Sequence, residues 1–302
     1  MMAAASPSPS AGSDAQRPLR VAAAQIDLEW EDRRSNLARL DDWVASAVDR
    51  DARLVLFPEM FPTGFSMSVE RVAEPWDGPS VQRLVELATR HGAWIGGSIA
   101  ELPPGADPDQ QPEAATPPTP RPRNTFVLAS PAGSLHRYAK RFGFSPAGEG
   151  ARFAAGDDRL VVPIDGVRCA LAVCYDLRFA PEFWDQALDV EAFLVVANWP
   201  EARRQHWRTL LAARAIENQA YVVGVNRVGE GGGLRYAGDS AVIDPLGEHL
   251  ASAAHQEALL VADLDPQRVR AVRAELPFLG DRRDAPAVQL VESDGLASRR
   301  ID

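Results

Sequence analysis

The sequence predicts an α/β protein in which helices cover the face of a β-sheet. Short apolar runs typical of strands occur at residues 19–27, 54–61 and 93–101. Between them lie segments whose apolar residues recur at helical spacing. This β-α-β-α-β order implies a sheet with helices packed on it.

Two helices separate these first strands. The segment 36–52 places five apolar residues on one helical face: Leu37, Leu40, Trp43, Val44 and Val48. The segment 80–92 is predicted to begin with Ser80 as its N-cap and to stop at Gly92, because these residue types are favoured at the two ends of a helix.

The composition changes over residues 102–123, which are rich in proline and poor in apolar residues. Such a stretch cannot pack into a core, so we expect a solvated loop insertion there. The later elements are expected in this order: a hairpin from 124–131 and 134–142, strands at 159–164 and 167–173, a helix at 181–188, a strand at 192–199, a helix at 203–220, a strand at 221–229, three antiparallel strands over 237–265 and a helix at 266–276.

The sequence contains no internal repeat, and no clear linker separates the predicted elements. We therefore expect one domain over residues 18–276, with a disordered tail at 1–17 and a second tail at 277–302. The N-terminal tail has no apolar core and no early cationic cluster, so it is not expected to be a secretory signal.

Charge and composition narrow the class of function. The net charge is −10, which argues against nucleic acid or an anionic membrane as a partner, since both require a basic surface. No apolar run approaches the roughly 20 residues that span a bilayer. The two cysteines lie close together and cannot staple a fold of this size, so a reducing cytoplasm is the expected compartment.

The ratio of lysine to arginine draws attention to one residue. Of 32 lysines and arginines only Lys140 is a lysine. A coding bias toward arginine would also tend to replace an exposed lysine, so its retention indicates a need for a compact ammonium. Chance survival is the alternative interpretation.

The two cysteines are expected to differ in role. Cys169 and Cys174 are an odd number of positions apart and would point to opposite faces of a strand, so neither a disulfide nor a zinc site is expected. Cys169 lies inside the apolar run and is interpreted as a core residue. Cys174 ends the strand, where α/β proteins bind ligands, and is either a nucleophile or an inert buried thiol.

Glu59 follows another buried strand and is flanked by Pro58 and Met60. An unpaired carboxylate in apolar surroundings has a raised pKa, which suits a general base; a solvent-facing turn residue is the alternative. A thiol needs a base or a nearby cation for activation. Glu59 and Lys140 supply one of each.

These residues carry a family resemblance. "FPEMF" around Glu59, "YAKR" around Lys140 and "VCYDLRF" around Cys174 resemble the Glu-Lys-Cys constellation of the nitrilase, or carbon–nitrogen hydrolase, superfamily, and the likeness runs over residues 19–276. It implies a four-layer α-β-β-α sandwich that usually pairs into a dimer. It also implies that Cys174 is the nucleophile, Glu59 the base and Lys140 the oxyanion stabiliser, with no metal or organic cofactor.

The same resemblance extends to further residues. Glu149 matches the second glutamate of the family, and the backbone N–H of Tyr175 matches its second oxyanion donor. "CYDLRF", "ANWP" and "ARAIENQAYVVGVNRVG" resemble the omega-amidase branch, which hydrolyses the terminal amide of short dicarboxylic monoamides such as 2-oxoglutaramate and 2-oxosuccinamate. The chain departs from relatives after Lys140, where Phe142 and Gly143 replace a common His-Leu-Phe run, and in the proline-rich insertion.

Substrate binding is assigned to residues near the strand ends. Arg178 is expected either to bind a substrate carboxylate or to form an ion pair with Asp176, Glu182 or another acid. The residues expected to line or close the pocket are Asn198, Trp199, Phe61 and Phe65, with a core position as the alternative for Trp199.

Several alternatives remain open. Carbamoyl amidases and nitrilases share the same triad, and a noncatalytic member would serve as an interaction scaffold. A papain-like enzyme would need a histidine base, and the only H-x-E, at His255, lies between two predicted strands. A metalloenzyme is disfavoured because no two of the five histidines have ligand spacing.

Overall fold

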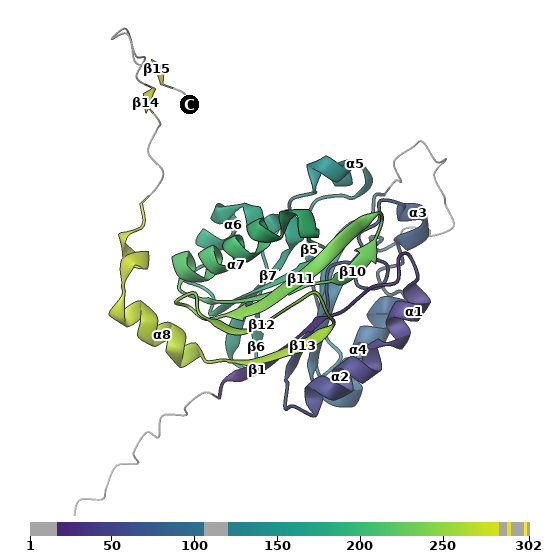
Figure 1. The fold of residues 1–302 in the computed structure, drawn as a ribbon, viewed down its shortest axis with the longest axis horizontal. Helices are drawn as coiled ribbons and strands as arrows, with labels where there is room; N and C mark the ends of the chain where they lie inside the picture. Colours follow the sequence, from purple (N-terminus) through teal and green to yellow (C-terminus); the bar gives the residue numbers. More distant parts are fainter. Residues whose placement is uncertain (1–16, 106–119, 284–288, 291–298, 301–302) are drawn as a thin grey trace, which may run out of the picture.

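The computed structural model describes residues 17–105, 120–283, 289–290 and 299–300 (Figure 1). The predicted N-terminal tail, apart from Arg17, lies outside the described residues, as do most of the insertion and much of the C-terminal tail. Two short strands of that last segment pair antiparallel: β14 (Gln289–Leu290) and β15 (Arg299–Arg300).

The first sheet has six strands in the order β13-β1-β2-β3-β4-β5. β1, β2 and β3 are parallel, because helices connect them as the sequence predicts, whereas β4 and β5 form the predicted hairpin. The strands are β1 (Leu19–Gln25), β2 (Leu54–Leu56), β3 (Trp94–Glu101), β4 (Arg123–Ala129), β5 (Leu135–Ala139) and β13 (Ala258–Leu264).

The second sheet has seven strands in the order β10-β11-β9-β8-β7-β6, with β12 paired to β11. Its central strands β7, β8 and β9 are parallel, and their neighbours on both sides are antiparallel. The strands are β6 (Val161–Ile164), β7 (Val167–Val173), β8 (Ala192–Ala197), β9 (Tyr221–Asn226), β10 (Val228–Gly231), β11 (Leu234–Ile243) and β12 (His249–Ala254).

Helices cover the outer face of each sheet, and four 3₁₀ turns connect elements within the described residues. The α-helices are α1 (Arg33–Ala38), α2 (Leu40–Val48), α3 (Val69–Val72), α4 (Pro79–His91), α5 (Glu149–Arg152), α6 (Ala180–Trp184), α7 (Arg204–Asn218) and α8 (Pro266–Glu275). The 3₁₀ turns are η1 (Ser145–Ala147), η2 (Cys174–Arg178), η3 (Glu201–Arg203) and η4 (Phe278–Asp281). None of the described helices is long and apolar enough to cross a membrane.

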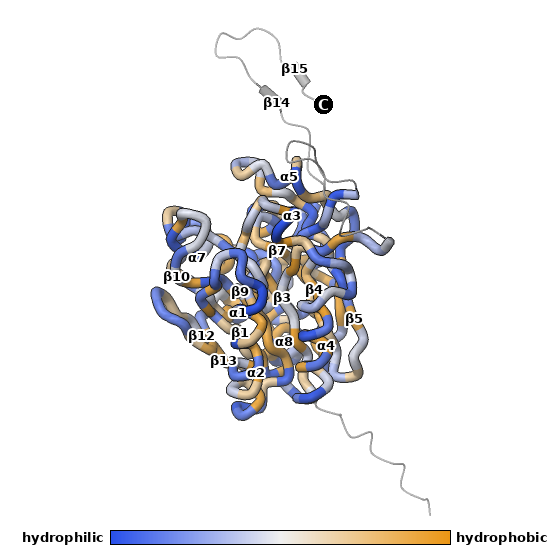
Figure 2. Tube along the Cα trace, turned by 90° about the vertical axis from the view of Figure 1, so that its right-hand side faces the viewer, coloured by the Kyte–Doolittle hydropathy of each residue, from blue (hydrophilic) through white to orange (hydrophobic). Residues whose placement is uncertain are grey.

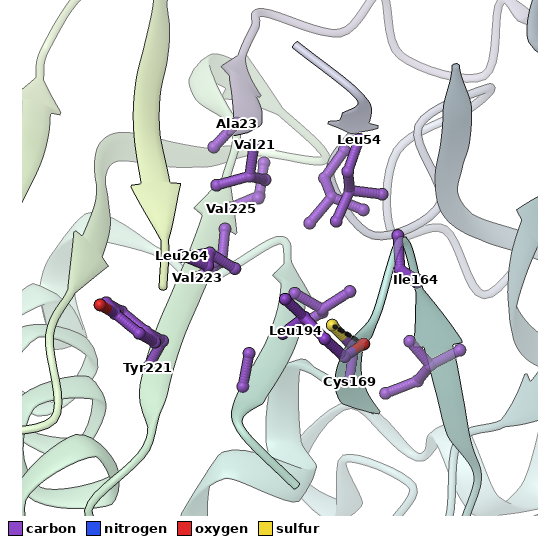
Figure 3. Packing of buried hydrophobic residues seen from close by; sticks show 14 of the residues in the cluster. Val21, Ala23, Leu54, Ile164, Cys169, Leu194, Tyr221, Val223, Val225 and Leu264 are labelled. Atoms are coloured by element: carbon purple, nitrogen blue, oxygen red, sulfur yellow. Dashed lines mark hydrogen bonds between the residues drawn. The ribbon is translucent and has the colours of Figure 1, made fainter. Parts of the chain in front are cut away.

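Three buried layers of side chains hold the two sheets and the helices together. Between the sheets, Val21 and Leu54 of the first meet Leu194 and Val223 of the second (Figure 3). Each fully buried side chain of this kind contributes roughly 1.5–3 kcal/mol relative to an exposed one. The polar residues accordingly lie toward the outside of the molecule (Figure 2).

The outer layers complete the sandwich. Leu84 of α4 and Val44 of α2 pack on the outer face of the first sheet. Trp207 of α7 and Phe183 of α6 pack on the outer face of the second. The order of layers is helix, sheet, sheet, helix, so the expected four-layer α-β-β-α sandwich is confirmed.

The first two helices differ in detail from their prediction. The helix expected over 36–52 is two helices, α1 and α2, that meet at Arg39. The apolar spacing runs through this break and so does not reveal it. Ser80 is not an N-cap, because α4 begins one residue earlier with Pro79 and is capped by Gly78. Gly92 does end α4, in the left-handed conformation that glycine adopts without strain.

The C-terminal half contains two further differences. The three strands expected over 237–265 are not one sheet, since β11 and β12 form a hairpin but β13 crosses to pair with β1 of the other sheet. The strand expected at 221–229 is interrupted after Asn226, and β10 starts at Val228. The tail expected from residue 277 begins with η4, whose Leu279 is buried.

Candidate active site

Four predicted residues come together where strands of both sheets end. Glu59 follows β2, Lys140 follows β5, Cys174 follows β7, and Glu149 is the first residue of α5. Glu59 is 0% exposed, Glu149 1% and Lys140 3%, so the alternative that Glu59 faces solvent in a turn is wrong. Buried charges of this kind persist only where they are paired.

Lys140 is held between two carboxylates. Its Nζ donates to Glu59 Oε1 at 2.9 Å and to Glu149 Oε2 at 2.8 Å. Burial acts to lower the pKa of Lys140, but the charges of Glu149 and Glu59 outweigh burial and hold the pKa well above its ordinary value. Lys140 is therefore an ammonium at any physiological pH and cannot act as a base.

The same charges act in the opposite direction on the thiol. Burial is the largest cause that raises the pKa of Cys174 well above its ordinary value, and the neighbouring Glu59 carboxylate and its hydrogen bond to the thiol raise it further. Lys140 alone among the large causes lowers it. Cys174 is thus a neutral thiol in the resting site, and a base must remove its proton before the sulfur can attack.

The backbone at Cys174 is an elbow. Cys174 has a φ of 48°, which is unusual for a residue with a side chain, and it begins η2 directly after the last residue of β7. The backbone N–H of Tyr175 lies in the first turn of η2, where N–H groups have no partner within the helix. This turn places Cys174 and Tyr175 beyond the strand end, where both line a cavity.

Two asparagines position Glu59. The sequence did not predict this role for either of them. Asn124 of β4 donates through Nδ2 to Glu59 Oε1 at 2.8 Å and to Glu149 Oε1 at 3.2 Å. Asn198, predicted to line the substrate pocket, donates its backbone N–H to Glu59 Oε2 at 2.8 Å and its Nδ2 to the Glu59 carbonyl. Asn198 does line the cavity, but its amide group is directed to Glu59.

A cavity of about 270 Å³ opens in front of Cys174. Its walls are mostly aromatic and aliphatic, and they include the predicted residues Phe65, Tyr175, Arg178, Asn198 and Trp199. Among the described residues that line it, none is an aspartate or a glutamate, and two are arginines, Arg178 and Arg203. The cavity is therefore cationic although the chain is strongly acidic overall.

Arg178 forms no ion pair with an acid among the described residues, so the structure does not support the alternative interpretation. Its guanidinium lies 4.7 Å above the Trp199 ring, and Nη2 is 3.2 Å from His206 Nδ1. Glu182 is paired instead with Arg141 and Arg159. Trp199 was expected either to line the pocket or to lie in the core. It does both, because it lines the cavity and also packs against buried Trp207.

Two aromatic residues on the loop after Glu59 have different positions. Phe65 lines the cavity, and its ring centroid is 5.0 Å from Lys140 Nζ. Phe61 is fully buried against Phe57, so the prediction that it closes over the site is wrong. A loop residue and a core residue look alike here because both positions are apolar in sequence.

Arg203 was missed by sequence reasoning. It ends η3, lines the cavity, and its guanidinium lies 5.2 Å from the Phe144 ring centroid. The segment around it is rich in arginine, so no signal distinguishes the one that faces the cavity.

His255, the possible base of a papain-like enzyme, is hydrogen-bonded to Arg204 and does not line the cavity. The described residues hold no cluster of three His, Cys, Asp or Glu side chains able to bind a metal ion.

A partly buried thiol beside a carboxylate and an ammonium is typical of hydrolases that transfer acyl groups through a cysteine. The chain belongs to the carbon-nitrogen hydrolase family, whose model matches residues 20–274. The omega-amidase YafV of Yersinia enterocolitica is 41% identical over 266 residues, 87% of this chain and 96% of the relative. The 2-oxoglutaramate amidase of Paenarthrobacter nicotinovorans is 35% identical over 88% of this chain and 90% of its own.

Solved structures agree with this assignment. XC1258 from Xanthomonas campestris, a CN-hydrolase superfamily protein with an arsenic adduct in its active site, has a TM-score of 0.77 at 36% identity and covers 89% of this chain and 98% of that chain. A mutant amidase from Nesterenkonia sp. AN1, with acrylamide added to its active-site cysteine, has a TM-score of 0.70 at 28% identity, over 86% and 98% of the two chains.

Proposed function

We propose that this protein is an omega-amidase, which hydrolyses the terminal amide of short dicarboxylic monoamides such as 2-oxoglutaramate and 2-oxosuccinamate. The observation that carries this assignment is the cavity in front of Cys174, which presents two arginines and no acid among its described lining residues. An anionic substrate with a reactive amide at its other end fits both features. The names of the two relatives above point to the same substrates.

In the first half of the reaction, Glu59 removes the thiol proton of Cys174 as the sulfur attacks the amide carbon. Glu59 is prepared for this role because both its oxygens are already fixed, Oε1 by Lys140 and Oε2 by the backbone of Asn198. The developing oxyanion is held by the Lys140 ammonium and the backbone N–H of Tyr175. Glu149 keeps Lys140 in place.

In the second half, Glu59 returns the proton to the leaving nitrogen, so that ammonia departs and a thioester remains on Cys174. Glu59 next takes a proton from water, and the resulting hydroxide attacks the thioester carbonyl. Collapse of that intermediate releases the carboxylic acid and the thiolate, which recovers its proton from Glu59. Each proton taken is returned, and the chain needs no cofactor for any step.

The substrate carboxylate is assigned to Arg178. A planar guanidinium binds a carboxylate through two parallel hydrogen bonds, and Trp199 supports the guanidinium from below. A chain with a net charge of −10 repels anions, so a local cation is required for such a substrate to bind.

The function is tested by ammonia release from purified protein. The panel contains 2-oxoglutaramate, succinamate, a neutral amide of equal length, a carbamoyl amide and a nitrile. We expect the highest kcat/KM on the carboxylate-bearing amides. Faster turnover of the carbamoyl amide or the nitrile would reassign the chain within its family, and no turnover of any substrate would favour a noncatalytic scaffold.

Replacing Arg178 with methionine should lower kcat/KM for the anionic amides by about 10- to 150-fold, since one charge-assisted hydrogen-bonded contact is worth roughly 1.5–3 kcal/mol. The neutral amide should be spared. Steady-state kinetics on both substrates measure the difference, with the exposed Arg50→Met as the matched control. Equal losses on charged and neutral amides would assign Arg178 to structure.

We also propose that the protein is a homodimer, as the family resemblance implies. What supports this is a set of exposed apolar side chains on and around α6, α7 and the C-terminal end of α8: Trp184, Leu188, Ile216, Leu276 and Phe278. Light scattering coupled to size-exclusion chromatography should give twice the mass of 32.7 kDa. The mass of a single chain at assay concentration would contradict this. The cytoplasmic location stays a prediction.

A further inference from the structure

One carboxylate beside the active site has no part in the mechanism above. Asp176 lies two residues after Cys174 and is fully buried. Its Oδ1 accepts the backbone N–H of Phe142 at 3.0 Å. Its Oδ2 accepts the backbone N–H of Val173 at 2.9 Å and the hydroxyl of Tyr138 at 2.9 Å.

These three donors flank the two reacting segments. Tyr138 and Phe142 stand two residues before and two residues after Lys140, and Val173 directly precedes Cys174. Lys140 follows β5, the edge strand of the first sheet, whereas Cys174 follows β7 of the second sheet. No strand pairing joins β5 to β7, so the carboxylate of Asp176 ties the two segments together across the sheets.

We propose that Asp176 is a positioning residue that holds the Lys140 ammonium and the Cys174 elbow in register. An ionised carboxylate only accepts hydrogen bonds and has about four sites for doing so, which matches three converging donors. A neutral replacement of the same shape must present a donor to one of the backbone N–H groups. The backbone N–H of either Phe142 or Val173 would then lose its hydrogen bond to residue 176.

The charge on Asp176 responds to pH in the range where the enzyme would work. Burial raises the pKa of Asp176 to about 6, although the ammonium of Lys140 and the hydrogen bonds from Val173, Phe142 and Tyr138 act to lower it. Above this value the carboxylate accepts all three bonds. As the pH falls through about 6 the group gains a proton and the arrangement is lost, so activity should fall on the acid side.

The hydroxyl of Tyr138 keeps its proton in that range. Burial, followed by the charge of Asp176, raises the pKa of Tyr138, so its hydroxyl remains a donor. The charged side chains on neighbouring elements are engaged elsewhere: Arg141 with Glu182, and Arg214 with the carbonyl of Leu177.

The test compares pH profiles of kcat for wild type, Asp176→Asn and Tyr138→Phe, with the exposed Asp49→Asn as the matched control. Wild type should show an acid limb with an apparent pKa near 6. Asp176→Asn should lose about 100-fold in kcat near pH 8, since small misplacements of reacting groups cost this much. KM should stay unchanged because Asp176 does not line the cavity. Its remaining activity should lack the limb.

Tyr138→Phe removes one oxygen atom and with it a hydrogen bond that lowers the pKa of Asp176. The acid limb should therefore move to higher pH in this variant. An unmoved limb in Tyr138→Phe overturns the proposal even if Asp176→Asn fails to fold. A folded Asp176→Asn variant with wild-type kcat and an unchanged limb overturns it as well.

The inference rests on the proposed function only through the use of an amide assay. The rate of Cys174 alkylation by iodoacetamide at pH 8, followed by mass spectrometry, requires no substrate assignment. Asp176→Asn should slow this reaction relative to wild type and Asp49→Asn, because the thiol moves relative to Glu59 and Lys140. Equal alkylation rates would overturn the positioning role. Failure of wild type to hydrolyse any amide would overturn only the substrate assignment.

Discussion

Replacing Cys174 with alanine is expected to abolish amide hydrolysis and the covalent acyl-enzyme together. Without the sulfur no thioester forms, and losing the nucleophile of a comparable triad costs on the order of a million-fold in kcat. Intact-mass spectrometry of wild type mixed with a slow amide should show one adduct, which peptide mapping places on Cys174.

Cys169 provides the matched control. It is fully buried inside β7, where burial raises the pKa of its thiol well above the ordinary value. A Cys169→Ala variant should keep the adduct and the turnover of wild type. Hydrolysis at an undiminished rate by Cys174→Ala, or an adduct on Cys169, would remove Cys174 from the mechanism.

The sequence was sufficient to predict the fold class and the cluster of Glu59, Lys140, Glu149 and Cys174. Glu59, Lys140 and Cys174 each come at or just beyond a strand-like run, and the ends of strands in an α/β sheet gather at one edge. Glu149 was assigned by the family resemblance instead. The two cysteines were distinguished by position, because Cys169 lies inside the apolar run and Cys174 ends it. The catalytic roles of the four residues stay predictions.

Long-range pairing was not predictable in the same way. β13 looks like a third hairpin strand after β12, but it pairs with β1, about 240 residues earlier in the chain. An antiparallel edge strand carries the same apolar pattern whichever sheet it joins, so the pattern cannot decide between the two. The break at Arg39 was hidden for a related reason, since apolar spacing describes a face and not the continuity of a helix.

Partners of the catalytic groups were also beyond sequence reasoning. Asn124 reaches Glu59 and Glu149 from β4, and Asp176 reaches the segment after Lys140 from η2. Polar residues at strand ends are common, and their targets depend on how the two sheets stack. In the structure these residues form a polar network in which Lys140 is paired with two carboxylates and Asp176 accepts three hydrogen bonds.

Exchanging Lys140 for arginine is expected to leave the enzyme close to inactive although the positive charge is kept. Lys140 Nζ sits 2.9 Å from Glu59 and 2.8 Å from Glu149 in a space that leaves the residue 3% exposed. A guanidinium is larger and planar, so it must displace a carboxylate and cannot put a single donor where the oxyanion forms. Loss of one oxyanion donor costs about 100- to 1000-fold in turnover.

The neighbouring Arg141 provides the control for the exchange at Lys140. Arg141→Lys makes the reverse exchange one residue away, at a partly exposed ion pair with Glu182, and should leave turnover within a few-fold of wild type. The pKa of Lys140 lies well above its ordinary value, so the wild-type charge is constant across the assay range and the loss in Lys140→Arg reflects geometry. If folded Lys140→Arg turned over amides at nearly the wild-type rate, the compact ammonium would have no role at the oxyanion. The retention of one lysine among 32 cations would then be chance.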